Sequence, residues 1–196
     1  MANELKHADI GNELTKSEWE ATTTHIANNQ AANDMLYFNG TTWIRATTAT
    51  ILSLLKIAKA VKLADETVNN SNTLQNDDAL LFAVSTNDRW GFIIQVVFTG
   101  HVDGDIKFAI TTPGGTHCNW TGVGYTGGTL TQFTIINATT SQAVDTNGAT
   151  ERSLVIIGEA RTTAAGNMQL QWAQSTAHAS DTKVLAGSWL VAWKVN

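Results

Sequence analysis

Beyond about residue 60, apolar and polar side chains alternate with a period of two, the spacing that places every second side chain on one face of a β-strand. Clusters of Asn, Asp, Ser and Gly, which favour turns, separate the alternating runs. In 90–98 one face would carry Trp90, Phe92, Ile94, Val96 and Phe98, and in 167–174 one face would carry Met168, Leu170 and Trp172. The pattern predicts strands at 60–63, 66–69, 80–84, 90–98, 105–111, 132–138, 153–162, 167–174 and 183–195.

This part of the chain does not alternate strands with helices, so a parallel, doubly wound sheet is not expected. Strands of this length and spacing favour two antiparallel sheets packed face to face. The composition is rich in Thr and Gly and includes a single proline, which agrees with β structure. The sequence therefore predicts an all-β fold in which residues 61–196 form an antiparallel jelly-roll sandwich.

The stretch MLYFNGTTWIR, residues 35–45, has the pattern of a β-hairpin that precedes this domain. Two apolar runs flank Asn39 and Gly40, a pair that readily adopts the positive φ angles of a tight turn. An isolated two-stranded hairpin is only marginally stable in water. We therefore expect this hairpin to attach to another surface.

Two helices are predicted around the hairpin. Thr15 and Glu18 have the spacing of a capping box, which predicts the start of a short helix. Residues 1–50 are thus expected to form a small N-terminal anchor that contains a helix and the hairpin. Apolar residues recur at helical spacing in 51–61, so 51–60 are interpreted as a helical connector. The connector either packs on the following domain or associates with its copies in a bundle.

The predicted last strand, 183–195, differs from the others because both of its faces are apolar. A sandwich in a monomer normally buries one face of each sheet, and large exposed apolar patches mark interfaces. We therefore expect a homo-oligomer whose interface includes Trp189, Leu190, Val191 and Trp193. In the alternative, the hairpin or the connector covers the second face within one chain.

Composition and charge narrow the range of partners. With 12 basic and 17 acidic residues, the chain has a formal net charge of −5, which disfavours binding to nucleic acid or to anionic membranes. No stretch approaches the roughly 18 apolar residues of a membrane-spanning helix, and the first thirty residues lack the apolar core of a signal peptide. Cys118 is the single cysteine, so a disulfide framework within the chain is excluded.

The sequence contains no motif that predicts catalysis, so neither an enzyme nor a cofactor is expected. His101, Asp103 and Asp105 alternate and could offer ligands to a divalent cation. The segment does not match a calcium loop, however, and Asp-Gly-Asp is common in hairpin turns. His117 and Cys118 are adjacent, and adjacent residues of a strand point to opposite faces. We therefore predict no metal site.

Residues 112–131 are rich in Gly and are predicted to form one long loop. Loops of this length in compact domains are often functional. His117, Asn119, Trp120 and Tyr125 lie in it, and they could stack on a sugar ring and hydrogen-bond its hydroxyls. The same residues could instead fill the axis of a trimer, and the sequence leaves both interpretations open.

Several stretches resemble virion proteins of tailed phages. The resemblance to their C-terminal jelly-roll domains rests on 63–98, which includes ADETVNNS, LQNDD and FAV, and on 105–115 and 153–174. LTKSEWEA at 14–21 and DMLYFNGTTWIRA at 34–46 are similar to modules that precede such domains in tail-fibre and head-decoration proteins. The resemblance implies a tumour-necrosis-factor-like jelly roll, usually trimeric, with a structural or adhesive role.

Within that class, a capsid decoration (cement) protein is the first expectation, because the chain has no repeats that would build a long fibre shaft. The resemblance then implies a homotrimer on the surface of the virion, made in the host cytoplasm and bound to the major capsid protein or other virion proteins. The hairpin residues expected to grip the capsid are Tyr37, Phe38, Asn39, Gly40 and Trp43. The alternative is a head-fibre or tail-fibre adhesin that binds a receptor or a glycan.

Overall fold

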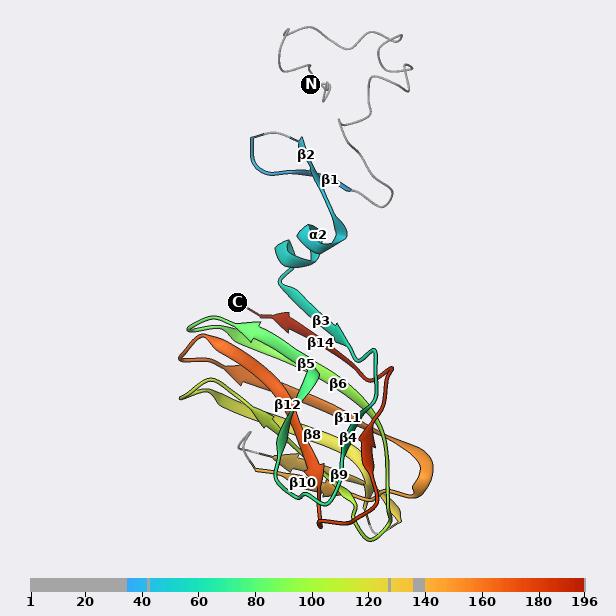
Figure 1. The fold of residues 1–196 in the computed structure, drawn as a ribbon. Helices are drawn as coiled ribbons and strands as arrows, with labels where there is room; N and C mark the ends of the chain where they lie inside the picture. The colour runs from blue at the N-terminus through green and yellow to red at the C-terminus, as the bar shows by residue number, and fades with distance from the viewer. Residues whose placement is uncertain (1–34, 42, 127, 136–139, 196) are drawn as a thin grey trace, which may run out of the picture. The chain divides into compact units, whose positions relative to one another are not determined.

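The computed structural model describes residues 35–41, 43–126, 128–135 and 140–195. Contacts within the chain divide it into two compact units, Met1–Leu54 and Leu55–Asn196. The described elements of the first unit are strands β1 (Met35–Phe38) and β2 (Trp43–Ala46) and helix α2 (Thr48–Leu54) (Figure 1). The helix predicted from residue 15 lies outside the described residues.

The predicted hairpin is confirmed. Strands β1 and β2 are antiparallel and Phe38 is paired with Trp43. Gly40 has a φ of +98°, a conformation that glycine adopts without steric cost. The backbone N–H of Thr41 donates to Oδ1 of Asn39 over 2.9 Å, so the Asn side chain stabilises the turn.

Helix α2 is shorter than the sequence predicted. The hydroxyl of Thr47 accepts a hydrogen bond from the backbone N–H of Thr50 (3.2 Å), which caps the helix start. The helix ends at Leu54, and Lys56 then adopts a φ of +54°, which breaks the helical path. Residues 57–61 form strand β3, so the helix predicted over 51–61 is wrong in its second half, and the 51–60 connector is divided between the two units.

The second unit consists of twelve strands among its described residues. They are β3 (Ile57–Val61), β4 (Glu66–Val68), β5 (Gln75–Val84), β6 (Arg89–Gly100), β7 (Ile106–Thr111), β8 (His117–Thr126), β9 (Thr129–Ile135), β10 (Gln142–Val144), β11 (Gly148–Arg161), β12 (Gly166–Gln174), β13 (Thr182–Val184) and β14 (Trp189–Lys194). The small sheet has the order β10-β7-β12-β5. The large sheet has the order β3-β14-β6-β11-β8-β9, with β13 also paired to β6 and β4 paired to β13.

The two sheets pack as a sandwich, and most neighbouring strands are far apart in the sequence (Figure 1). In the large sheet, β14 lies between β3 and β6, and in the small sheet β12 lies between β5 and β7. Among the described residues the paired strands are antiparallel, and the isolated bridge between Asn147 and Ala149 is parallel. The prediction of an all-β, jelly-roll-like sandwich is confirmed.

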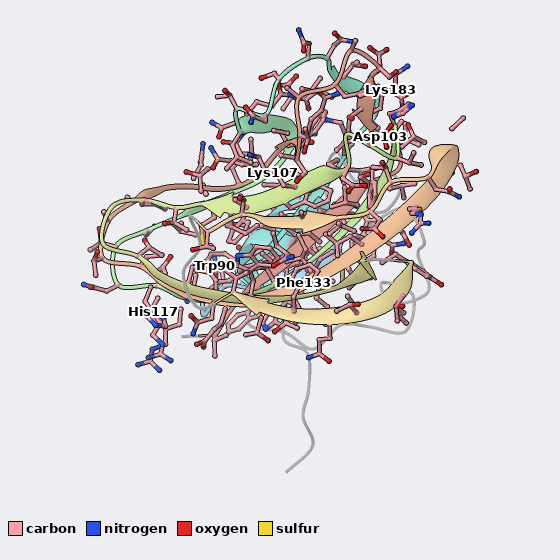
Figure 2. The ribbon with its side chains drawn as sticks, turned by 90° about the horizontal axis from the view of Figure 1, so that it is seen from below. Trp90, Asp103, Lys107, His117, Phe133 and Lys183 are labelled. Atoms are coloured by element: carbon pink, nitrogen blue, oxygen red, sulfur yellow. The ribbon has the colours of Figure 1, made fainter. Side chains whose placement is uncertain are left out.

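The core lies between the sheets and contains the faces that the alternation predicted. Trp90, Phe92, Ile94, Val96 and Phe98 of β6 are buried, as are Met168, Leu170 and Trp172 of β12. Aromatic rings from the two sheets pack against each other in the core. Phe98 of the large sheet and Phe108 of the small sheet are arranged edge to face, with ring centroids 5.5 Å apart. Figure 2 shows Trp90 between the layers, whereas His117 points away from them.

The prediction of a single loop at 112–131 is wrong, because most of this stretch is the hairpin of β8 and β9. Strand β8 pairs with β11 and extends the large sheet. Its glycines fit this position, since a Cβ on Gly122 would lie 2.3 Å from the ring of Phe133. Because Gly is depleted in strands, a segment that contains several glycines is not readily predicted as a strand from its sequence.

The predicted last strand, 183–195, is likewise two strands rather than one. A turn separates β13 from β14, and Gly187 in this turn has a φ of +89°. The hydroxyl of Ser188 accepts a hydrogen bond from the backbone N–H of Val97 (2.9 Å) and lies within 2.9 Å of the carbonyl oxygen of Leu185. These bonds hold the turn against β6, so only β14 presents the two apolar faces that the sequence suggested.

Candidate binding surfaces

The side of the large sheet that faces away from the core, here called the outer face, carries a band of apolar side chains. Its rows follow the strand register: Val191 of β14, Ile93 of β6 and Ile157 of β11 are direct neighbours. Ile157 is 52% exposed, although it lies in the middle of the sheet. Trp189, Val155 and Val123 form a parallel row across the same face, in register with Gln95 of β6.

The predicted interface residues divide between the two faces of β14. Trp189, Val191 and Trp193 lie on the outer face and are at least partly exposed. Leu190 is 1% exposed and belongs to the hydrophobic core of its own chain. The prediction that Leu190 contacts another subunit is therefore wrong, because its side chain already packs between the sheets.

The predicted ligand residues do not form one cluster. Trp120 is buried, and its ring meets Phe133 edge to face at 5.7 Å, so it cannot stack on a sugar. His117, Asn119 and Tyr125 alternate along β8 on the outer face. His117 and Tyr125 are about 26 Å apart, since a strand rises about 3.3 Å per residue. Of the four predicted ligand residues, only His117 and Asn119 are therefore close together on the outer face.

A hollow of about 350 Å³ lies at one end of the outer face. Its lining includes Arg89 and Gly91 of β6, Glu159 and Arg161 of β11, and Trp193 of β14. No local pattern in the sequence brings these residues together, because β6, β11 and β14 are distant along the chain. The strand register alone makes them neighbours: Trp193 and Glu159 both pair with Gly91.

The same end of the sheet receives two of the residues predicted to contact a ligand. On β8, Asn119 is opposite Glu159 and His117 is opposite Arg161. The pairing of β8 with β11 therefore explains why these two residues lie beside the hollow. The prediction of a loop at 112–131 gave no strand register, so the sequence did not indicate that His117 and Asn119 lie next to charged side chains.

His101, Asp103 and His178 form a second cluster, at the turns that follow β6 and β12. The two imidazole rings stack with centroids 4.0 Å apart, and Nδ1 of His101 lies 3.5 Å from the Asp103 carboxylate. Asp105, the third ligand candidate in the sequence, instead accepts a hydrogen bond from the backbone N–H of Thr146 (3.0 Å). His178 takes its place, although it is more than seventy residues away in the sequence.

The hydrogen bonds of these histidines oppose metal binding. Nδ1 of His101 accepts the backbone N–H of Asp103 (3.2 Å), and Nδ1 of His178 accepts that of Ser180 (3.0 Å). Each neutral ring must then carry its proton on Nε2. A metal ion on Nε2 would move that proton to Nδ1, where it would face a backbone donor. The cluster is better described as two turns held together by their histidines.

The anchor hairpin exposes apolar side chains. Met35, Leu36 and Phe38 of β1 are 51–53% exposed, and Tyr37 is partly buried. Asn39 and Gly40 of the turn are also exposed. The side chain of Trp43 lies outside the described residues.

No protein-family model matches this chain, and no curated protein matches it significantly. Across the described residues, no helix has the length and apolar character needed to cross a membrane.

Proposed function

We propose that this protein is a trimeric decoration (cement) protein of a tailed-phage capsid. In this proposal the hairpin of β1 and β2 attaches to the capsid, and the jelly-roll domain is displayed on the surface of the particle. The major capsid protein is the proposed partner. The proposal rests on the sequence resemblance described above and on the two apolar surfaces of the described residues.

The exposed side chains of the hairpin are the observation that carries the proposal. Leu36 and Phe38 are about half exposed on a two-stranded hairpin, and helix α2 buries none of its residues. Such a hairpin is marginal alone, so a partner that covers these side chains would stabilise it. Attachment by this unit is consistent with that requirement.

The apolar band on the outer face is the surface through which we expect the chains to associate. Val191, Ile93 and Ile157 form an apolar row in the middle of a sheet whose other face is already packed on the core. An exposed apolar band of this kind usually marks a protein interface. Trp193 lies in a different row, together with the charged Glu159, and both residues line a hollow. Charged residues are depleted at the centre of interfaces, so this row is expected at the rim of the interface.

Co-sedimentation with assembled capsids of the phage that encodes the chain tests attachment. We expect Leu36→Asp to abolish sedimentation with capsids, because it places a charge in the apolar contact. Leu63→Asp is the matched control, since Leu63 is 89% exposed and lies in the jelly-roll domain. Failure of the wild-type protein to sediment with capsids, or equal effects of the two substitutions, would refute attachment by the hairpin.

Light scattering tests self-association separately. The wild-type protein should have three times the mass of one chain, and Ile157→Asp should reduce it to one chain mass. Val102→Asp is the control, because Val102 has a similar exposure (53%) but lies in the turn between β6 and β7 and not in a strand of the large sheet. A monomeric wild-type protein would rule out the trimer.

A further inference from the structure

The indole of Trp193 lies directly against the backbone of β6. A Cβ built on Gly91 would be 2.6 Å from Cε2 and Cζ2 of Trp193, so the ring occupies the space that any other side chain would need. A glycine inside a strand weakens the sheet and often marks a close approach. The indole therefore covers Gly91 on the outer face, and Trp193 is still 38% exposed.

Charged side chains lie beside this ring. Glu159 is paired with Gly91 across β6 and β11, and its Oε1 is 3.2 Å from Nη2 of Arg161. The pair presents a carboxylate acceptor next to a guanidinium donor, and both side chains are half exposed. Neighbouring hydroxyl groups of a ring sugar can each donate and accept a hydrogen bond, so they match such a pair.

We propose that the hollow at Trp193 binds a single pyranose unit of a glycan. The apolar C–H face of the sugar stacks on the indole, and two adjacent hydroxyls bind Glu159 and Arg161. The volume of about 350 Å³ is at the small end of the range for ligand pockets, which fits one sugar ring rather than a long oligosaccharide. The combination of an aromatic platform with a few polar groups is the chemistry that orients such ligands.

The site goes beyond the proposed role in capsid decoration. It belongs to the jelly-roll domain, whereas the proposed attachment belongs to the hairpin in the other unit. A virion protein with both sites would bind the particle through one unit and sugars through the other. Loss of sugar binding would leave co-sedimentation with capsids unchanged, so the two proposals can fail independently.

Saturation-transfer NMR with the full-length protein tests the proposal. The probes are the methyl pyranosides of glucose, galactose, mannose, N-acetylglucosamine and glucuronic acid, and at least one should show transfer. Calorimetry then measures its affinity. Trp193→Ala should weaken binding by roughly tenfold or more, which corresponds to about 1.4 kcal/mol, because the sugar loses its stacking surface.

Leu63→Ala is the control, because Leu63 is an apolar residue of the same domain that is 89% exposed and lies outside the lining of the hollow. Its affinity should stay within about twofold of the wild type, as expected for an independent site. Glu159→Gln provides a second test that does not disturb packing, since Glu159 is half exposed. It should also weaken binding, because the amide lacks the charge of the carboxylate.

Absence of transfer to all five pyranosides would overturn the proposal. Equal loss of affinity in Trp193→Ala and Leu63→Ala would also overturn it, because the indole in the hollow would then have no specific role. A third contrary result is that Trp193→Ala has a smaller mass than the wild type in light scattering while Leu63→Ala keeps the wild-type mass. The hollow would then be a contact between subunits.

Discussion

Lys62 and Asp77 form an ion pair beneath the surface of the jelly-roll domain, with Nζ 3.0 Å from Oδ2 and both side chains almost fully buried. Glu66 completes the cluster with Oε2 2.6 Å from the same Nζ. Burial lowers the pKa of Lys62, but hydrogen bonds to Glu66 and Asp77 raise it by more, so the net pKa is raised. Oδ1 of Asp77 also accepts the backbone N–H groups of Ala79 and Leu80.

Removal of the Asp77 carboxylate should therefore destabilise the fold strongly. Asp77→Ala leaves the Lys62 ammonium without one of its buried partners, and the expected loss of unfolding free energy is about 3–5 kcal/mol. Asp78→Ala is the control, because Asp78 is exposed next to it in β5. Urea denaturation measures both variants. A loss below about 1 kcal/mol for Asp77→Ala would show that the pair contributes little to stability.

Asp88 should make the free energy of unfolding depend on pH in the acidic range. Its burial raises the pKa, but hydrogen bonds from Lys194, the backbone N–H of Ser85 and the indole of Trp90 lower it by more, so the net pKa is lowered. The carboxylate therefore stabilises the fold above its unfolded pKa of about 3.9, and this contribution is lost as the pH falls through the lower folded value.

Denaturation of Asp88→Asn and wild type between pH 3 and pH 7 measures this contribution. The wild type should be more stable by about 1.5–3 kcal/mol at pH 6, the range for hydrogen bonds to a charged group, and the difference should shrink at pH 3. Asp181→Asn is the control, since Asp181 is half exposed and its contacts with Lys183 (3.8 Å) and with the side-chain amide of Asn69 (3.0 Å) lie at the surface. A difference for Asp88→Asn that stays constant with pH would contradict the prediction.

Gly158 should tolerate no side chain. A Cβ at this position would be 2.2 Å from the ring of Phe92 and 2.8 Å from the backbone oxygen of Asn119, and neither group can move freely. Gly158→Ala should cost about 1–3 kcal/mol of unfolding free energy, as overpacking of a core does. Gly114→Ala should change stability little, because nothing lies within 4 Å of its Cβ position. Thermal unfolding of both variants checks the comparison.

Cys118 should be unreactive in the folded protein. Burial, with a smaller contribution from the charge of Glu159, raises the pKa of its thiol to about 12. The thiolate, which is the nucleophile, is therefore nearly absent at pH 8. A disulfide reagent should modify the protein only after denaturant is added. Rapid modification of the native protein would show that the large sheet opens near β8.

The cluster of His101, Asp103 and His178 should not bind zinc tightly. Zinc on either Nε2 would break an Nδ1 hydrogen bond to a backbone N–H, as described above. Calorimetric titration with zinc chloride at pH 7 should show no one-to-one binding. One-to-one binding that His178→Ala removes would show that the turns rearrange around a metal.

The sequence predicted the sandwich and its core well, because strands such as 90–98 have one strongly apolar face. It failed for β8, where small residues let Phe133 cover Gly122 and the strand signal is weak. It also failed for β3, whose apolar residues fit a helical period as well as a strand. Short apolar runs of this kind are ambiguous until their pairing partner is known.

The candidate hollow was harder to predict than the fold. Trp193 was singled out for its apolar character, but its neighbours Glu159 and Gly91 come from β11 and β6. Only the strand register brings these residues together, and no local pattern in the sequence encodes the register between distant strands. The alternation that identifies a buried face therefore says little about which side chains gather on the opposite face.

The pairing of β3 with β14 has a consequence for how the protein is made. Val61 is the register partner of Trp189, so one of the first strands of the domain joins one of the last. During translation β3 leaves the ribosome more than a hundred residues before its partner does, and its edge stays open in that interval. The large sheet can close only after β14 has been released, so this domain cannot finish folding before its last strand has been made.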